Sequence, residues 1–425
     1  MKTINQIYLF AALTRIITIL LGTISYLWAG SYDTSAEIVL SENPSYHHLD
    51  FLNIFIRWDA VYFIHIAEHG YVYEQETAFF PFLPYITYYI SNTVFMPLQS
   101  ILGKQYTLVV AGALISNISF ICAAGYLYKL TRLIYPSQPK LALFSAIAFC
   151  LSLPSIFMSA FYTESLFALL SFMGMYAITR QYYFYASLLW GIASLTRSNA
   201  IIYIGFFAYE FIVKRLRGSI KSLIAGIVRT TIYSLITMSG FLYFQYSIYK
   251  EYCQANQLKT NPRPWCSSTL PFVYNYVQKE YWNNGFLSYY EIKQIPNFLL
   301  AMPIILLSGF GLWTFASKDW IHWLSLSIIT NKQDELSFMN RRATVFMYLW
   351  TFLLFYSTTC MHVQVIIRFF TSLPPLYWYI GYLFNQGFQS KATFYQQILS
   401  NGILYYFVIY GLISTILFAS FLPPA

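Results

Sequence analysis

The chain carries few charged residues for its length. Only 10% of its 425 residues are Asp, Glu, Lys or Arg, whereas a soluble domain has about 25%. No hydrophilic stretch is long enough to form a separate soluble domain, and hydrophobic residues make up 58% of the chain. The composition therefore excludes an ordinary soluble protein. It predicts an all-α, polytopic membrane protein with a single membrane-embedded domain over residues 1–425.

Several motifs of common enzyme classes are also missing. The sequence has no P-loop, no Rossmann glycine pattern and no nucleophile elbow. Its five cysteines show neither a CxxC nor a zinc-ribbon spacing, so we expect no metal and no cofactor. Cys253 and Cys266 share one polar loop, where a disulfide would form if that loop faces an oxidising lumen.

Repeated apolar runs of about 17–25 residues predict about eleven transmembrane helices. The expected spans are 7–28, 107–128, 141–160, 165–180, 182–195, 200–213, 222–248, 295–315, 343–361, 370–383 and 402–421. The net charge of +9 comes from basic residues between these runs, which is typical of cytosolic loops rather than of nucleic-acid binding. This topology puts the N-terminus in the cytosol, and a large first loop (29–104), a second loop (249–296) and the C-terminus in the lumen.

The spans 182–195 and 200–213 are too short to cross a membrane fully, so we interpret them as a hairpin. Its tip, Arg197-Ser198-Asn199, would lie at or below the lumenal face, where irregular backbone is tolerated only if it lines a cavity. The fork of an arginine suits a phosphate. The alternative is that Arg197 is buried and pairs with Glu164.

The most polar stretch of the first loop is 56–85, where charged residues alternate with Trp, Tyr and Phe. It is too polar for lipid, but its aromatic content is typical of a membrane interface. Asp59 follows Arg57 and Trp58 in this stretch. A carboxylate in a partly dry, aromatic setting can act as a general base; the alternative is a surface carboxylate paired with Arg57.

His65, Glu68 and His69 spell the inverted zinc-peptidase signature HxxEH. No third ligand follows in a helical context, so we interpret them as the polar face of an interfacial helix. Another polar group, His362 and Arg368, lies at a helix boundary on the same side as Asp59 and Arg197, and a break between the two is expected. The alternative for Arg368 is a side chain that extends to the interface.

Five segments occur in an order and spacing that resemble the GPI mannosyltransferase 2 family. They are RWDAVYFIHIAEHGYVYEQETAFFPFLP, LTRSNA, RPWC, YVQKEYWNNGFLSYYEIKQIPNFLLAMP and HVQVIIRFFTSLPPLYW. The resemblance implies a GT-C glycosyltransferase fold, whose first lumenal loop carries the catalytic acid, in the endoplasmic reticulum membrane. It also implies transfer of the second mannose, α1,6, from dolichyl-phosphate-mannose to the GPI-anchor precursor. Fungal members suggest a small membrane accessory subunit.

The resemblance places Asp59 at the position of the catalytic acid. The neighbouring residues that match the same signature are expected to bind the acceptor or donor sugar: Arg57, Trp58, Glu68, His69 and Glu74. The departing phosphate needs cationic donors, for which Arg197, His362 and Arg368 are the lumenal candidates. A single displacement assisted by one base inverts the anomeric centre.

Two other functions compete with this interpretation. The first is a related GT-C transferase that acts on another dolichol-linked or protein acceptor. The second is a lipid transporter or scramblase. The second is disfavoured because the polar residues gather in one loop, whereas a transport path needs them near the membrane midplane on several helices.

Overall fold

The computed structural model describes residues 2–33, 44–254, 263–329, 338 and 340–423, and these residues contain helices and no strand. Among them, five helices are long and apolar enough to cross a membrane. These are α1 (Lys2–Ala29), α6 (Lys104–Ile134), α11 (Ile220–Tyr249), α13 (Ile295–Ala316) and α18 (Phe394–Ala419). The protein is therefore a multi-pass membrane protein.

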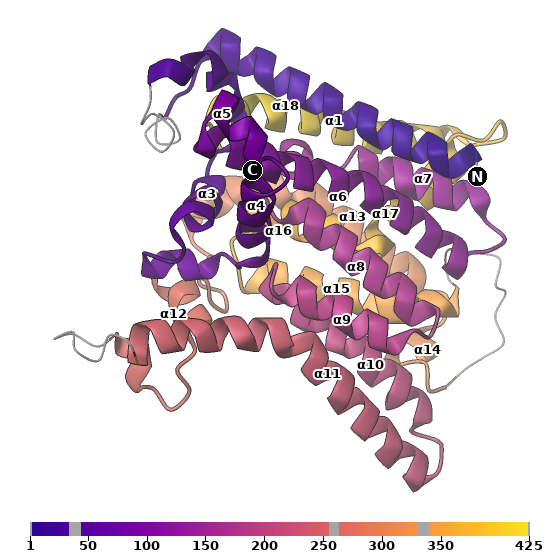
Figure 1. Cartoon of the computed structure of the whole chain (residues 1–425). Helices are drawn as coiled ribbons and strands as arrows, with labels where there is room; N and C mark the ends of the chain where they lie inside the picture. The colour runs from indigo at the N-terminus through magenta and orange to yellow at the C-terminus, as the bar shows by residue number, and fades with distance from the viewer. Residues whose placement is uncertain (1, 34–43, 255–262, 330–337, 339, 424–425) are drawn as a thin grey trace.

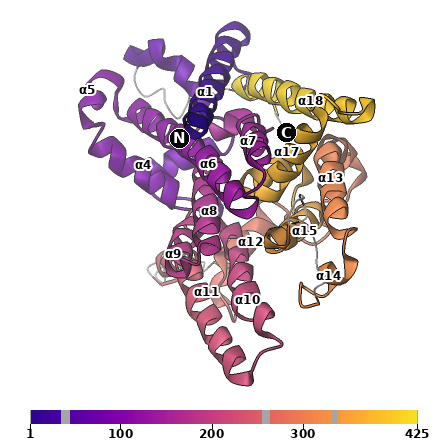
Figure 2. The ribbon, with the colours of Figure 1, turned by 90° about the vertical axis from the view of Figure 1, so that its right-hand side faces the viewer.

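Shorter apolar helices occupy the other expected spans. They are α7 (Pro139–Cys150), α8 (Glu164–Thr179), α9 (Tyr183–Ser194), α10 (Ile204–Phe211), α15 (Thr344–Thr359) and α17 (Pro374–Gly387). In Figure 2, α9, α10 and α11 form one arm of the molecule, and α13, α15, α17 and α18 lie on another side. Each expected span thus contains a helix, while the number of complete crossings stays a prediction.

Residues 44–104 of the first loop are folded into short helices that pack on one end of the bundle. They are a 3-10 helix (Pro44–Phe55), α3 (Ala60–His69), a 3-10 turn (Glu74–Ala78), α4 (Phe82–Asn92), a second 3-10 turn (Met96–Leu98) and α5 (Gln99–Leu102). The second loop adds α12 (Val273–Glu280) at the same end. Figure 1 shows the C-terminus near this end and the N-terminus at the opposite end, as the expected topology requires.

A buried carboxylate joins the two loops. Glu74 is 4% exposed and accepts hydrogen bonds from Trp265 Nε1 at 2.7 Å and from the Tyr281 hydroxyl at 2.9 Å. Cys253 and Cys266 form a disulfide beside Trp265, so the pairing that the sequence left open is present. Because hydrogen bonds to a buried charge are strong, the loops form one connected layer.

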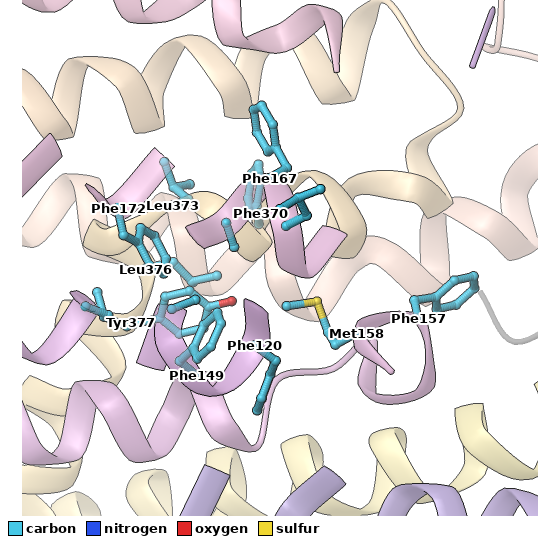
Figure 3. Packing of buried hydrophobic residues seen from close by; sticks show 14 of the residues in the cluster. Phe120, Phe149, Phe157, Met158, Phe167, Phe172, Phe370, Leu373, Leu376 and Tyr377 are labelled. Atoms are coloured by element: carbon cyan, nitrogen blue, oxygen red, sulfur yellow. The ribbon is translucent and has the colours of Figure 1, made fainter. Parts of the chain in front are cut away.

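Large aromatic side chains fill the centre of the bundle (Figure 3). Phe149 stacks on Phe120 at 4.9 Å between ring centroids and meets the edge of Tyr377 at 5.3 Å. Where α8 meets α9, Gly174 lies under the indole of the fully buried Trp190. Small residues allow such close helix contacts in membranes, and this contact holds the hairpin arm against the bundle.

We predict that Gly174→Ala destabilises the protein. A Cβ at this position would lie 2.2 Å from Trp190 Nε1, and overpacking of this kind costs about 1–3 kcal/mol. Gly205→Ala is the matched control, because a Cβ there meets no atom within 4 Å and alanine favours a helix. Thermal unfolding in detergent should show a lower midpoint only for Gly174→Ala. Equal midpoints for the two variants would contradict the packing described here.

The disulfide gives a second prediction. Alkylation of the denatured, unreduced protein should label only Cys122, Cys150 and Cys360, and reduction should raise the labelled number to five. Mass spectrometry of the intact chain measures both numbers. Cys253→Ser should lower stability by about 3 kcal/mol, the amount typical of a short closed loop. Five labelled cysteines without reduction would rule out the pairing.

Candidate functional site

A cleft of about 230 Å³ opens at the end of the bundle where the two loops pack. Its walls come from α3, the hairpin tip, α12 and the connection between α15 and α17. The residues with polar side-chain atoms that line it are Asp59, Thr163, Thr196, Arg197, Ser198, Asn199, Tyr274, Gln278, Trp282, Asn284, Tyr356, His362 and Arg368. The cleft therefore brings together Asp59, Arg197, His362 and Arg368, which the sequence predicted to lie on one side.

Asp59 lies directly before α3. Its carboxylate is 31% exposed, and Oδ2 forms an ion pair with Nη1 of Arg368 at 2.9 Å. The preceding residue, Trp58, has a φ of 55°, a left-handed conformation that is strained for a large side chain. This turn separates Asp59 from its neighbour Arg57.

Arg57 points away from the cleft. It is fully buried, and its guanidinium lies over the ring of Phe421, at the end of the chain, at 5.1 Å. Its carbonyl accepts a hydrogen bond from the Tyr162 hydroxyl at 2.7 Å. The alternative in which Asp59 pairs with Arg57 is therefore wrong, because Arg368 takes that place.

Glu164 is the centre of the charged network under the cleft. It is the first residue of α8 and is fully buried. Its Oε1 accepts from Nη1 of Arg197 at 2.9 Å and from Nε of Arg368 at 2.7 Å. The structure thus contains the Arg197–Glu164 pair. This pair is the alternative to a phosphate site that the sequence left open. Arg197 nevertheless lines the cleft, so the pair does not remove it from the site.

The network of Asp59, Glu164, Arg197 and Arg368 contains two negative and two positive groups, so its formal charge is zero. Aromatic rings fix the cations in place: Arg197 lies 5.0 Å from the ring of Phe369, and Arg368 lies 4.8 Å from that of Phe157. Glu164 Oε2 is buried and has no hydrogen-bond partner. One carboxylate oxygen of Glu164, Oε1, therefore joins the two guanidiniums.

His362 is held on the other wall of the cleft. Its Nε2 donates to the carbonyl of Trp282 at 2.7 Å, and its ring stacks on Tyr289 at 4.4 Å. The break in the chain lies before the position expected: α15 ends at Thr359, and His362 is extended and precedes a helical run that contains Arg368, made of a 3-10 turn (Val363–Val365), α16 (Ile366–Phe369) and a second 3-10 turn (Phe370–Ser372).

The hairpin tip is attached to the second loop. Ser198 donates a hydrogen bond to the Tyr274 hydroxyl at 2.7 Å. Burial raises the pKa of Tyr274, so its phenol stays protonated at neutral pH and serves as a hydrogen-bonding group rather than as a base. Asp59 therefore remains the better candidate for the base.

The other residues expected to bind sugar lie outside the residues that line this cleft. Trp58 packs on Phe421 with a centroid distance of 5.2 Å, and Glu74 joins the two loops as described above. Glu68 lies near His69, at 3.7 Å, and accepts from Gln105. Their role in sugar binding, like that of Arg57, stays a prediction.

The HxxEH segment forms no cluster with a third ligand. His65 Nδ1 lies 2.5 Å from Glu76, and the described residues contain no group of three His, Cys, Asp or Glu side chains suited to a metal ion. Glu76 also accepts from the backbone N–H groups of Val72 and Tyr73 at 2.9 Å each. These contacts give the segment a structural role in shaping the first loop.

A family model described as Mannosyltransferase (PIG-V) matches residues 4–425. The chain belongs to this family of mannosyltransferases. The chain is 32% identical to GPI alpha-1,6-mannosyltransferase 2 of Rattus norvegicus over 86% of this chain and 87% of that protein. It is also 32% identical to GPI mannosyltransferase 2 of Schizosaccharomyces pombe over 96% of this chain and 84% of the relative.

Among solved structures, the chain is similar to an oligosaccharyltransferase of Archaeoglobus fulgidus. The alignment has a TM-score of 0.46 and 12% identity, and it covers 97% of this chain and 55% of that one. This likeness is too distant to add to the family assignment.

We predict that Glu164→Gln lowers both stability and mannosyl transfer. A neutral amide cannot balance two guanidiniums, and breaking a buried ion pair costs about 3–5 kcal/mol. Thermal unfolding and transfer by the purified enzyme measure the two effects. Glu280→Gln, on the exposed end of α12, is the control. Unchanged stability in Glu164→Gln would show that Glu164 does not hold the network together.

Proposed function

We propose that this protein transfers the second mannose, in α1,6 linkage, from dolichyl-phosphate-mannose to the GPI-anchor precursor. Two findings support the acceptor and the linkage: the match to the mannosyltransferase family and the names of its relatives. The observation that carries the chemistry is the ion pair between Asp59 and Arg368 at the surface of the cleft. A carboxylate beside an arginine supports a base next to a cation that suits a phosphate.

In this proposal, Asp59 removes the proton of the acceptor hydroxyl. The ion pair occupies Oδ2, so Oδ1 is available to an acceptor that enters the cleft. The hydroxyl oxygen attacks the anomeric carbon of mannose while the bond to the phosphate oxygen breaks. A β-linked mannosyl phosphate would thereby give an α product, because one displacement inverts the configuration.

The donor phosphate would bind to Arg368 and Arg197, with His362 on the opposite wall. Because the network is neutral, an incoming phosphate competes with the carboxylates for these guanidiniums. Competition at Arg368 weakens the ion pair with Asp59 and leaves that carboxylate free to accept a proton. Binding of the donor would therefore activate the base. Guanidinium N–H groups directed at the developing phosphate charge would also stabilise the transition state.

We infer that the cleft faces the lumen of the endoplasmic reticulum. The basic residues Lys214, Arg341 and Arg342 line a different cleft, and the positive-inside rule assigns such residues to the cytosolic side. The Cys253–Cys266 disulfide belongs to the second loop, part of which lines the first cleft, and it fits an oxidising compartment. Lipid donor and acceptor would reach the cleft from the membrane, and a small accessory subunit, implied by resemblance to fungal members, would bind the same chain.

We predict that Asp59→Asn abolishes mannose transfer but leaves the protein folded and inserted. The amide keeps the shape of the side chain but cannot accept a proton, and a general base contributes about 10²–10⁴-fold to the rate. Turnover with dolichyl-phosphate-mannose and a one-mannose acceptor measures the effect. Cells that depend on this variant should accumulate the one-mannose precursor.

Glu291→Gln is the matched control, because Glu291 is an exposed acid of the second loop that pairs with Lys293. It should support normal turnover. Near-normal turnover in Asp59→Asn would remove Asp59 from the role of base. Accumulation of a different lipid-linked sugar would instead identify another acceptor.

A further inference from the structure

A second cleft lies at the opposite end of the same helices. α8 begins at Glu164, under the first cleft, and ends at Thr179, which lines the second. α15 runs the other way, from Val345 in the second cleft to Tyr356 in the first. Each of these helices has 16 residues and is therefore about 24 Å long. The two clefts thus lie near opposite faces of the membrane.

The second cleft has a volume of about 350 Å³, and cations line its rim. Lys214, in the 3-10 turn after α10, pairs with Glu210, which lies four residues earlier in α10. The charge of Lys214 is therefore balanced. Arg341 and Arg342 are the remaining charged side chains of the lining. Nε and Nη2 of Arg341 are hidden from solvent and have no hydrogen-bond partner among the residues that the structure describes. Buried donors without partners are costly, so a rotation of this side chain toward an anion in the cleft would give them partners.

The backbone that carries both arginines is fixed. Asn340 is 5% exposed, and its Nδ2 donates to the carbonyl of Ile134 at 2.8 Å. Its Oδ1 accepts from the backbone N–H of Arg342 at 2.9 Å. One buried amide therefore ties the arginine pair to the end of α6, so the rim of the cleft is preorganised before a ligand arrives.

Apolar side chains share the rest of the lining with the polar side chains of Thr179, Gln181 and Tyr209. The apolar side chains include Leu133, Ile134, Ile178, Phe206, Val345 and Phe346. A free inorganic anion gains nothing from such walls, whereas a lipid has an apolar tail next to its charged headgroup. Arginine binds phosphate through two parallel N–H groups, and basic pockets between membrane helices bind anionic headgroups.

We propose that this cleft binds the phosphate headgroup of an anionic membrane lipid, through Arg341 and Arg342, with part of an acyl chain against the apolar wall. The site is separate from the cleft that contains Asp59 and does not depend on the reaction proposed there. Inorganic phosphate shares the headgroup chemistry and is the other possible source of the anion.

Native mass spectrometry of the full chain in detergent tests this proposal, with phosphatidic acid, phosphatidylcholine and inorganic phosphate as separate probes. Arg341→Gln/Arg342→Gln should lower the affinity for phosphatidic acid by about tenfold or more, since each basic residue contributes on the order of 1 kcal/mol to such binding. Arg217→Gln/Lys221→Gln is the control, because both residues are exposed basic residues outside the lining. It should bind like the unchanged protein.

Arg342→Gln alone, which alters an exposed side chain, keeps the test valid if the double variant fails to fold; it should weaken phosphatidic acid binding severalfold. Equal loss in the control pair would mean that general charge, not the cleft, attracts the lipid. Unchanged binding in both arginine variants would overturn the site. Binding of inorganic phosphate as tight as that of phosphatidic acid would overturn the lipid assignment.

Discussion

The structure depends on one buried carboxylate that serves two guanidiniums. Glu164 is fully buried, and an isolated charge in such a place would be strongly unfavourable. Arg197 comes from the hairpin tip and Arg368 from the connection between α15 and α17. The segments that carry Glu164, Arg197 and Arg368 are distant in sequence. They must therefore meet in the fold, because each buried charge is stabilised by the others. The same convergence leaves a cleft above the charges, and it brings Asp59 to its edge.

The network has no net charge, and this determines how a charged substrate can bind. A cleft with excess positive charge would attract any anion over a long range, whereas a balanced network offers hydrogen-bond donors only at short range. Arg368 is shared between Asp59 and Glu164, so in the proposed mechanism a phosphate that binds Arg368 would change the surroundings of the proposed base. The proposed mechanism thereby connects recognition of the leaving group and activation of the nucleophile through a single side chain.

The sequence was sufficient for the helices, for the hairpin and for the grouping of Asp59, Arg197 and Arg368 at one cleft, because apolar run lengths and basic loops determine the order of the spans. The sequence was not sufficient to show which side chains the charged residues contact. Arg57 stands two residues from Asp59 but turns toward Phe421, since the backbone at Trp58 is left-handed. Glu74 binds Trp265, 191 residues later. Glu164 was visible as an acid at a helix start, yet its second partner, Arg368, could only come from tertiary packing.

Most polar groups of the cleft stand where helices begin, end or break. Asp59 precedes α3, Thr163 precedes α8, Arg197 lies between α9 and α10, and Arg368 lies in the interrupted segment before α17. Within a membrane, irregular backbone is tolerated only where protein or a water-filled cavity satisfies its polar groups. The breaks and the cleft therefore require each other: the breaks direct polar side chains inward, and the cleft supplies the solvent that the broken backbone needs. The proposed reaction between two lipid-borne sugars would need such a place, because its charged phosphate and its hydroxyl cannot meet in hydrocarbon.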